Sequence, residues 1–286
     1  EGRSHAWRFH ISRRLSGPRG NKSELSSATL TASVSLYLSA LFHLRWNTTR
    51  KLFLGYPGFW GSEVDPRRAE LLLFTCCLTS GLVDSTIYKG NTIFVGLGAS
   101  NQNPRPFGWA RSLTSIGCFV IGCFLFARLN RIIGAQRRGC LMLSFLIQAS
   151  IIVITAALVH GGVVSSALDD DDASQSTTRW DQEVPIVLLS LQSAGQIVAS
   201  RALGFNEIPT VVITSLLCDL MSDPKLFFLR NEKRDRRVIA FVLTLVGAIV
   251  GGWVTKATED IAPILWLSAG IKFIVAFSWG FWKTKT

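Results

Sequence analysis

After residue 68 the chain consists of long apolar runs separated by short polar or charged segments. The long runs are as follows: 69–88, 113–129, 140–164, 184–203, 238–254 and 261–282. Each has about the length that an α-helix needs to cross a hydrocarbon core of ~30 Å. Two further runs, 92–99 and 208–221, are too short for a full crossing. The pattern predicts an all-α, polytopic membrane helix bundle with about six transmembrane helices and two short discontinuous segments.

The apolar runs occur as two similar sets. Gly81 with its neighbours aligns with Gly195, and Gly122 and Gly247 lie 125 positions apart. Duplicated sets of apolar segments are typical of polytopic membrane proteins and often of secondary transporters. We therefore divide the chain into four parts: a basic, mostly disordered N-terminal segment (1–68), a first membrane repeat (69–164), an acidic loop (165–183) and a second membrane repeat (184–286).

The two repeats differ in length at one place. Gly81 and Gly195 are 114 positions apart, eleven fewer than the spacing between Gly122 and Gly247. The first repeat is therefore shorter near 85–89, by about 16 Å of helix. Either the first repeat is genuinely shortened, or a piece of the natural protein is absent from this sequence.

Loop charges predict the orientation of the helices. The loops at 130–139 and 222–237 are rich in Lys and Arg, which favours the cytoplasmic side, whereas 165–183 contains four consecutive aspartates and fits the opposite side. A topology of six crossings with both termini cytoplasmic places the basic loops on the cytoplasmic side and the acidic loop on the opposite side. The two three-helix repeats are then inverted relative to each other. Eight crossings, with both short runs spanning, is the alternative, but it places 222–237 on the wrong side.

Composition supports a membrane protein and argues against several other classes. Hydrophobic residues make up 48% of the chain and charged residues 17%, below the ~25% usual for soluble domains. The net charge of +11 comes from short loops, so no nucleic-acid partner is expected. The six cysteines lie in or beside apolar runs, so neither a metal site nor a disulfide framework is predicted. We expect the lipid bilayer as partner, no cofactor, and no enzymatic activity; a homo-oligomer is left open.

The first 22 residues are rich in arginine and contain one acidic residue, Glu1. This composition resembles a mitochondrial presequence. An unstructured basic cytoplasmic tail or a mispredicted first exon is the favoured explanation. The sequence therefore does not decide between the plasma membrane and an internal membrane.

Lys272 is the most informative polar residue. It lies midway along the last apolar run, too far from either end for its ammonium to reach the membrane surface easily. An ion pair with Asp84 or Asp219 would offset the cost of burying it, as a static clamp or as a proton- or ion-coupling element.

Other polar residues in the apolar runs form the rest of a candidate solute or ion path: Asn91, Thr92, Gln148, Gln192, Gln196 and Arg201. Gln192 and Gln196 share one helix face and, with Arg201, could contact a polar or anionic solute. Hydrogen bonding between helices is the alternative role for these glutamines. Gly122, Gly247 and Gly251 are predicted to permit close helix packing.

Several phrases of the chain resemble the YoaK-like family of multipass membrane proteins, in particular its fungal branch. They include Gly81-Leu82-Val83-Asp84, Gly90-Asn91-Thr92, Pro106-Phe107-Gly108-Trp109, Asn206-Glu207-Ile208-Pro209-Thr210 and Cys218-Asp219-Leu220-Met221. The resemblance covers about 69–283 and implies an integral membrane location and around six helices. It implies no activity, because the family is a domain of unknown function. The chain lacks a longer aromatic stretch that members have before the Gly90 phrase, at the place where the repeats differ.

Three functions are compatible with these features. A secondary transporter or permease for a small solute, with proton coupling as an option, fits the inverted repeats and buried charges. A non-transporting scaffold or assembly factor fits the lack of a recognisable substrate site. An intramembrane enzyme fits least, because the sequence contains no recognisable catalytic constellation.

Overall fold

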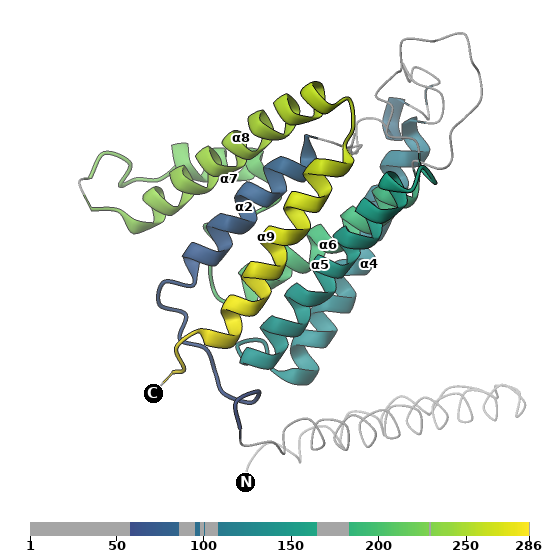
Figure 1. Cartoon of the computed structure of the whole chain (residues 1–286). Coiled ribbons are helices and arrows are strands. Elements are labelled where there is room, and N and C mark those ends of the chain that lie inside the picture. Colours follow the sequence, from purple (N-terminus) through teal and green to yellow (C-terminus); the bar gives the residue numbers. More distant parts are fainter. Residues whose placement is uncertain are drawn as a thin grey trace, which may run out of the picture. The chain divides into compact units, whose positions relative to one another are not determined.

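A computed structural model of the chain describes residues 58–85, 95–97, 100, 108–164, 183–228 and 230–285. These residues all belong to one compact unit, Leu54–Thr286. Within these ranges the regular structure is helical, apart from two isolated β-bridges. The principal helices are α2 (Glu70–Asp84), α4 (Gly108–Ile133), α5 (Arg138–His160), α6 (Glu183–Ala202), α7 (Ile213–Met221), α8 (Glu232–Thr258) and α9 (Ala262–Phe281) (Figure 1).

Five of these helices, α4, α5, α6, α8 and α9, are long and apolar enough to cross a membrane. The prediction of a polytopic all-α membrane bundle is therefore confirmed. The first predicted span, 69–88, differs, because α2 has only 15 residues, or about 22 Å. The remainder of that span and the shortened stretch near 85–89 lie almost entirely outside the described residues, as does most of the short run 92–99.

The helices pack as pairs. α2 lies along α8, α4 along α6, and α5 along α9, while α5 also contacts α6 and α2 contacts α9 (Figure 1). The most apolar stretches of α5, α6 and α9 are 50–61% buried, whereas those of α4 and α8 are only 22% and 28% buried. α4 and α8 therefore form the periphery, where exposed side chains such as Phe124 and Ile249 suit contact with lipid tails.

Glycines allow the closest of these helix contacts. A Cβ atom on Gly247 of α8 would lie 3.2 Å from the Cα atom of Gly81 on α2 and would overlap the Leu78 carbonyl oxygen. In the other pair, a Cβ on Gly122 of α4 would lie 2.7 Å from the Ala194 Cβ on α6. Only glycine leaves room for these backbones to approach so closely.

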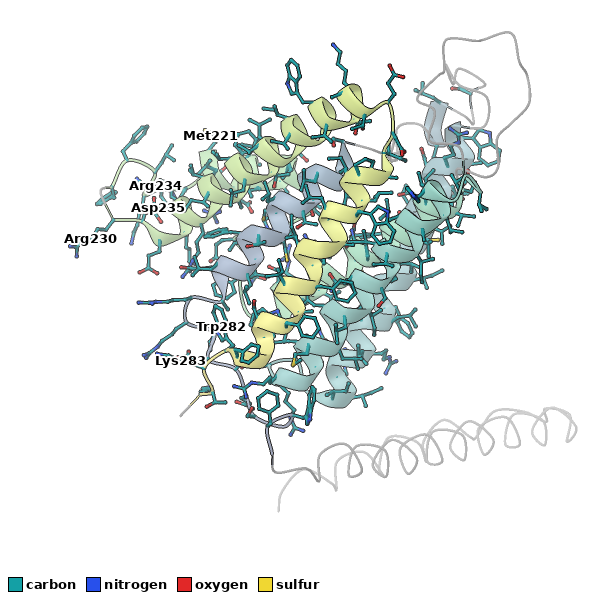
Figure 2. All side chains as sticks on the ribbon, viewed as in Figure 1. Met221, Arg230, Arg234, Asp235, Trp282 and Lys283 are labelled. Carbon is teal, nitrogen blue, oxygen red and sulfur yellow. The ribbon has the colours of Figure 1, made fainter. Side chains whose placement is uncertain are left out.

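Several polar segments meet at one end of the bundle. Isolated bridges join Glu63 to Arg137 and Val64 to Thr284, and an ion pair joins Glu70 to Arg236. The starts of α2, α5 and α8 and the end of α9 therefore lie together, as six crossings require. We call this the basic end, defined as 58–69, 134–137, 222–237 and 282–285; Figure 2 shows Arg230 and Lys283 projecting from it.

Part of the segment predicted to be disordered belongs to this end of the fold. The Val64 side chain is fully buried, and its backbone N–H donates to the Gln136 carbonyl over 2.9 Å. The Trp282 indole N–H donates to the Asp65 carbonyl over 3.1 Å. Residues 58–68 are too polar to be predicted as a helix, but their backbone groups bond to two other polar segments. The ordered fold therefore begins before residue 69.

The predicted short run 208–221 enters and leaves the bundle at the basic end. The Arg236 guanidinium lies 5.2 Å from the Phe205 ring centroid, and the Glu207 carboxylate lies 3.5 Å from the Lys233 ammonium. From the basic end the chain runs into the bundle without helical structure as far as Thr210, whose carbonyl lies beside Gln196. α7 then leads back to the basic end. We call residues 205–221 the re-entrant segment. The prediction that 208–221 does not cross fully is consistent with the nine-residue length of α7.

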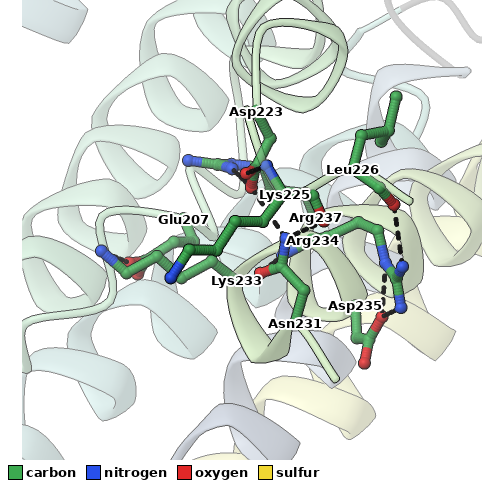
Figure 3. Close-up of polar contacts among 9 residues, drawn as sticks. All are labelled: Glu207, Asp223, Lys225, Leu226, Asn231, Lys233, Arg234, Asp235 and Arg237. Atoms are coloured by element: carbon green, nitrogen blue, oxygen red, sulfur yellow. Dashed lines mark hydrogen bonds and ion pairs between the residues drawn. The ribbon is translucent and has the colours of Figure 1, made fainter. Parts of the chain in front are cut away.

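A polar cluster fixes the exit of the re-entrant segment (Figure 3). The Asp223 carboxylate accepts hydrogen bonds from the Lys225 backbone N–H at 2.9 Å, from the Asn231 amide at 3.1 Å and from the Arg237 guanidinium at 3.0 Å. The Arg234 guanidinium donates to the carbonyls of Leu226 and Phe228. These bonds tie the connection between α7 and α8 to the first turns of α8.

The hydrogen bonds to the Asp223 carboxylate should persist as the pH is lowered to about 3.8. The hydrogen bond from the Lys225 N–H, followed by those from Asn231 and Arg237, lowers the pKa of Asp223 below its ordinary value of 3.8. The stabilisation is therefore present above that value and is lost as the pH falls through the lower pKa of the folded state. Hydrogen exchange of the 222–231 amides should be pH-independent, after correction for intrinsic rates, from pH 7 to pH 4. An Asp223→Asn variant should exchange faster throughout; equal protection in the variant would contradict this role.

Candidate functional site

Lys272 lies near the middle of α9 and is fully buried. Its ammonium donates to the Gln148 Oε1 on α5 over 2.8 Å and to the Gln196 Oε1 on α6. The ammonium also lies 5.2 Å from the centroid of the Phe145 ring. An ionisable side chain in the interior of the bundle therefore contacts two amide oxygens and an aromatic face.

Gln196 connects this lysine to two more elements. Its amide Nε2 lies within hydrogen-bonding distance of the Ser80 hydroxyl on α2 at 2.8 Å, the Cys76 carbonyl at 3.2 Å and the Thr210 carbonyl at 3.4 Å. On α5, the Gln148 Nε2 donates to the Ser144 hydroxyl at 3.3 Å. We call Ser80, Ser144, Gln148, Gln196, Thr210 and Lys272 the central polar cluster. It joins α2, α5, α6, α9 and the re-entrant segment.

Small residues next to the cluster bring neighbouring helices close. Gly81 follows Ser80 on α2 and faces Gly247 of α8, and Gly195 precedes Gln196 on α6 and faces the Phe126 ring of α4. An ammonium in the bundle interior is costly, and hydrogen bonds to the two amide oxygens offset part of that cost.

Three buried polar atoms near the same level have no hydrogen-bond partner among the described residues. They are the Gln192 Oε1, the Thr210 Oγ1 and the Ser268 Oγ. Gln192 lies one turn from Gln196, and Ser268 lies one turn from Lys272. Buried polar atoms are nearly always paired, so unpaired ones at a membrane site point to water or to a polar ligand.

The backbone at Thr210 has an unusual conformation. Its φ is +52°, which is rare for a β-branched residue and costs of order 1–3 kcal/mol. Two residues later, Val212 precedes the first turn of α7 and offers no side-chain cap. The re-entrant segment therefore turns sharply beside Gln196 before α7 begins at Ile213.

The predicted ion pairs of Lys272 with Asp84 and Asp219 are wrong. Both aspartates are exposed, whereas Lys272 is fully buried and donates to glutamines. Asp84 is the last residue of α2, one turn beyond Ser80. Asp219 lies on the exposed side of α7, because Leu216 and Leu220 occupy its buried side.

The other predicted path residues separate into two groups. Gln148, Gln192 and Gln196 are buried, and two of them contact Lys272. Arg201 is exposed near the end of α6 and lies 3.4 Å from the Asn206 amide oxygen, so it does not share a site with the glutamines. Asn91 and Thr92 lie outside the described residues. The packing glycines Gly122, Gly247 and Gly251 lie at helix contacts away from Lys272.

Three members of the cluster were not predicted from the sequence: Ser80, Ser144 and Thr210. Ser144 precedes Gln148 by one helical turn, a spacing that places both on one face. Ser80 adjoins Gly81, which marks a close helix contact. Thr210 could not be found this way, because its position depends on a non-helical turn inside the bundle.

The cluster offers an ammonium, amides and hydroxyls, which suit binding of a small polar solute rather than a metal. Within the described ranges, no three His, Cys, Asp or Glu side chains lie close enough together to hold a metal ion.

Comparison with known proteins gives the family of the chain. No curated protein and no solved structure matches it. A family model, described as a protein of unknown function (DUF1275), matches residues 72–278, which include most of α2 and most of α9. The match therefore covers the whole central polar cluster and most of the chain. The chain, with its five helices long and apolar enough to cross a membrane, belongs to the DUF1275 family of proteins of unknown function.

Proposed function

We propose that this protein is a secondary transporter or permease that moves a small solute across a membrane, and not an enzyme. The observation that carries the proposal is the central polar cluster, in which a fully buried lysine meets two glutamines from different helices. Polar residues inside a membrane protein are costly and typically line solute or ion paths.

Helix packing supports an inverted repeat. If α2, α4 and α5 correspond to α6, α8 and α9, the contact of α2 with α8 corresponds to that of α6 with α4, and both contacts exist. The contact of α2 with α9 corresponds to that of α6 with α5, and again both exist. The pair of α5 and α9 corresponds to itself. This is the pattern that a two-fold axis between α5 and α9 would produce.

The sequences of α5 and α9 support the same relation. Leu141-Met142-Leu143-Ser144 aligns with Leu265-Trp266-Leu267-Ser268, and Ile147-Gln148 then aligns with Ile271-Lys272. Gln148 and Lys272 are therefore equivalent positions that bond to each other across the proposed axis. Transporters built from inverted repeats place their substrate sites at such repeat interfaces, near the membrane midplane.

The re-entrant segment provides the discontinuous element that such transporters use. It reaches Gln196 from the basic end and returns as the short helix α7. The Lys and Arg excess of the basic end favours the cytoplasmic side, with both termini there. Rocking of one repeat against the other would open the cluster to each side in turn. Lys272 also suits proton coupling, because contact with water would let its ammonium exchange a proton and closure would isolate it.

A static scaffold is the alternative. The hydrogen bonds from Gln196 to Ser80 and Cys76 join helices in the way that structural glutamines do. In that case Lys272 would fix helix register and no solute would pass.

Solute profiling separates these functions. Cells that express the wild-type chain should show a changed distribution of at least one small solute between cytosol and medium. A Lys272→Gln variant at equal membrane abundance should lose this change. A Ser278→Ala variant, altered at a hydroxyl that bonds to the Ile274 carbonyl of the same helix, should keep it. Identical solute profiles for wild type and Lys272→Gln would favour the scaffold.

A further inference from the structure

We infer that the central polar cluster binds a small anion at the Lys272 ammonium, with hydroxyl donors from α9 and from the re-entrant segment. The inference rests on the proposed function for its biological role, since it names the solute class of that site. The binding itself can be tested without transport.

Charge is the first argument. Lys272 is fully buried, and its two hydrogen-bond acceptors are neutral amide oxygens. The predicted partners Asp84 and Asp219 are exposed and do not neutralise it. Buried charges are normally paired, because amide oxygens compensate an ammonium less completely than a carboxylate does. An anionic solute would supply the opposite charge that the cluster lacks.

The re-entrant segment supplies the second argument. α7 begins three residues after Thr210, whose carbonyl lies 3.4 Å from the Gln196 Nε2. Val212, Thr214 and Ser215 at the start of α7 are exposed, so the part of the segment that meets the cluster is the turn at Thr210. This turn brings a buried threonine beside the glutamine whose Oε1 accepts from Lys272.

Unpaired hydroxyls are the third argument and are independent of charge. The Thr210 Oγ1 and the Ser268 Oγ are buried and have no partner among the described residues. Thr210 is 1% exposed and Ser268 is fully buried, so both would lose hydrogen bonds to water without compensation. Hydroxyl groups donate to anions. They lie on the re-entrant segment and on α9, the two elements that would hold the anion.

The glutamines allow the cluster to exist with or without the anion. In the present arrangement both Oε1 atoms accept from Lys272. Rotation of either amide would turn an Nε2 donor toward the anion while the ammonium changed partner from an amide oxygen to the solute. A cationic solute fits less well, because Lys272 already occupies these oxygens and would repel it.

Thermal unfolding of the purified full chain in detergent tests the inference. Sodium acetate, chloride and phosphate are titrated against a bulky sulfonate salt, at constant sodium and ionic strength. At least one of these anions should raise the Tm saturably, by about 3 °C or more, because a ligand that binds only the folded state stabilises it. Lys272→Gln and Thr210→Val should each remove most of the shift, whereas Thr210→Ser, which keeps the hydroxyl, should retain it.

Two results would overturn the inference. One is the absence of any saturable shift in the wild type, which needs no variant to fold. The other is an undiminished shift in both Lys272→Gln and Thr210→Val, which would place the anion elsewhere. Anion binding without a change in cellular solute distribution would retain this inference and reject the transporter. Transport of a neutral solute, with no effect of any anion on the Tm, would retain the transporter and reject the inference of an anion site.

Discussion

Gln196→Leu should destabilise the folded protein by about 2–3 kcal/mol. The substitution removes an acceptor from the buried Lys272 ammonium and the donor that serves Ser80, the Cys76 carbonyl and the Thr210 carbonyl. Leaving buried polar groups unpaired costs about 1–3 kcal/mol each, and more for a charged group. Reversible unfolding in mixed detergent micelles gives the free energy of unfolding directly.

Gln192→Leu is the matched control. Gln192 lies one turn earlier on α6 and is also buried, but among the described residues its amide has a single hydrogen bond, to Ser193, and its Oε1 is unpartnered. We expect a loss near the ~0.6 kcal/mol average for hydrogen bonds in membrane bundles. Adding Lys272→Met to Gln196→Leu should recover part of the loss, because it removes the uncompensated charge. Equal losses for Gln192→Leu and Gln196→Leu would contradict the bonding described for Lys272.

Gly247→Leu should prevent α2 from packing on α8 and destabilise the protein by about 3 kcal/mol, the upper end for overpacking. A side chain at this position meets the backbone of α2 at Gly81, Leu78 and Leu82, which cannot move aside as a side chain can. The helices would have to separate along their whole contact. We expect the variant to show reduced membrane abundance and a lower Tm.

Gly252→Leu provides the comparison within the same helix. A Cβ at Gly252 would have nothing within 4 Å, and the residue is exposed. Replacing glycine in a helix with leucine is then neutral or favourable by up to about 1 kcal/mol. A Gly247→Leu protein as stable as Gly252→Leu would show that α2 and α8 do not approach closely.

Hydropathy predicted the spanning helices well, because a membrane helix must be apolar along its whole length. It predicted Lys272 as an important residue for the same reason, since a single charge interrupts such a run. The predicted partners of Lys272 were wrong, because the sequence shows that burying a charge is costly but does not show which residues surround it. Asp84 and Asp219 lie in the apolar runs 69–88 and 208–221, yet both face outward where those helices end.

Irregular segments were the least predictable. Residues 58–68 have no helical period, and their conformation depends on backbone hydrogen bonds to the carbonyls of Gln136 and Lys283. The turn at Thr210 likewise depends on packing beside Gln196, and neither contact follows from local sequence. The glycine contacts were easier to predict, because small residues at repeated positions mark close helix approach.

Accessibility of Ser268 tests the transporter account most directly. A Ser268→Cys variant, with the native cysteines replaced, is treated in oriented sealed vesicles with a membrane-impermeant thiol reagent from either face. Ser222→Cys, at the basic end, and Glu259→Cys, at the opposite end, are the controls and should each react from one face only. Alternating access predicts that Ser268→Cys reacts from both faces, because the cluster opens to each side in turn. Protection of Ser268→Cys from both faces, with both controls reactive, would contradict it.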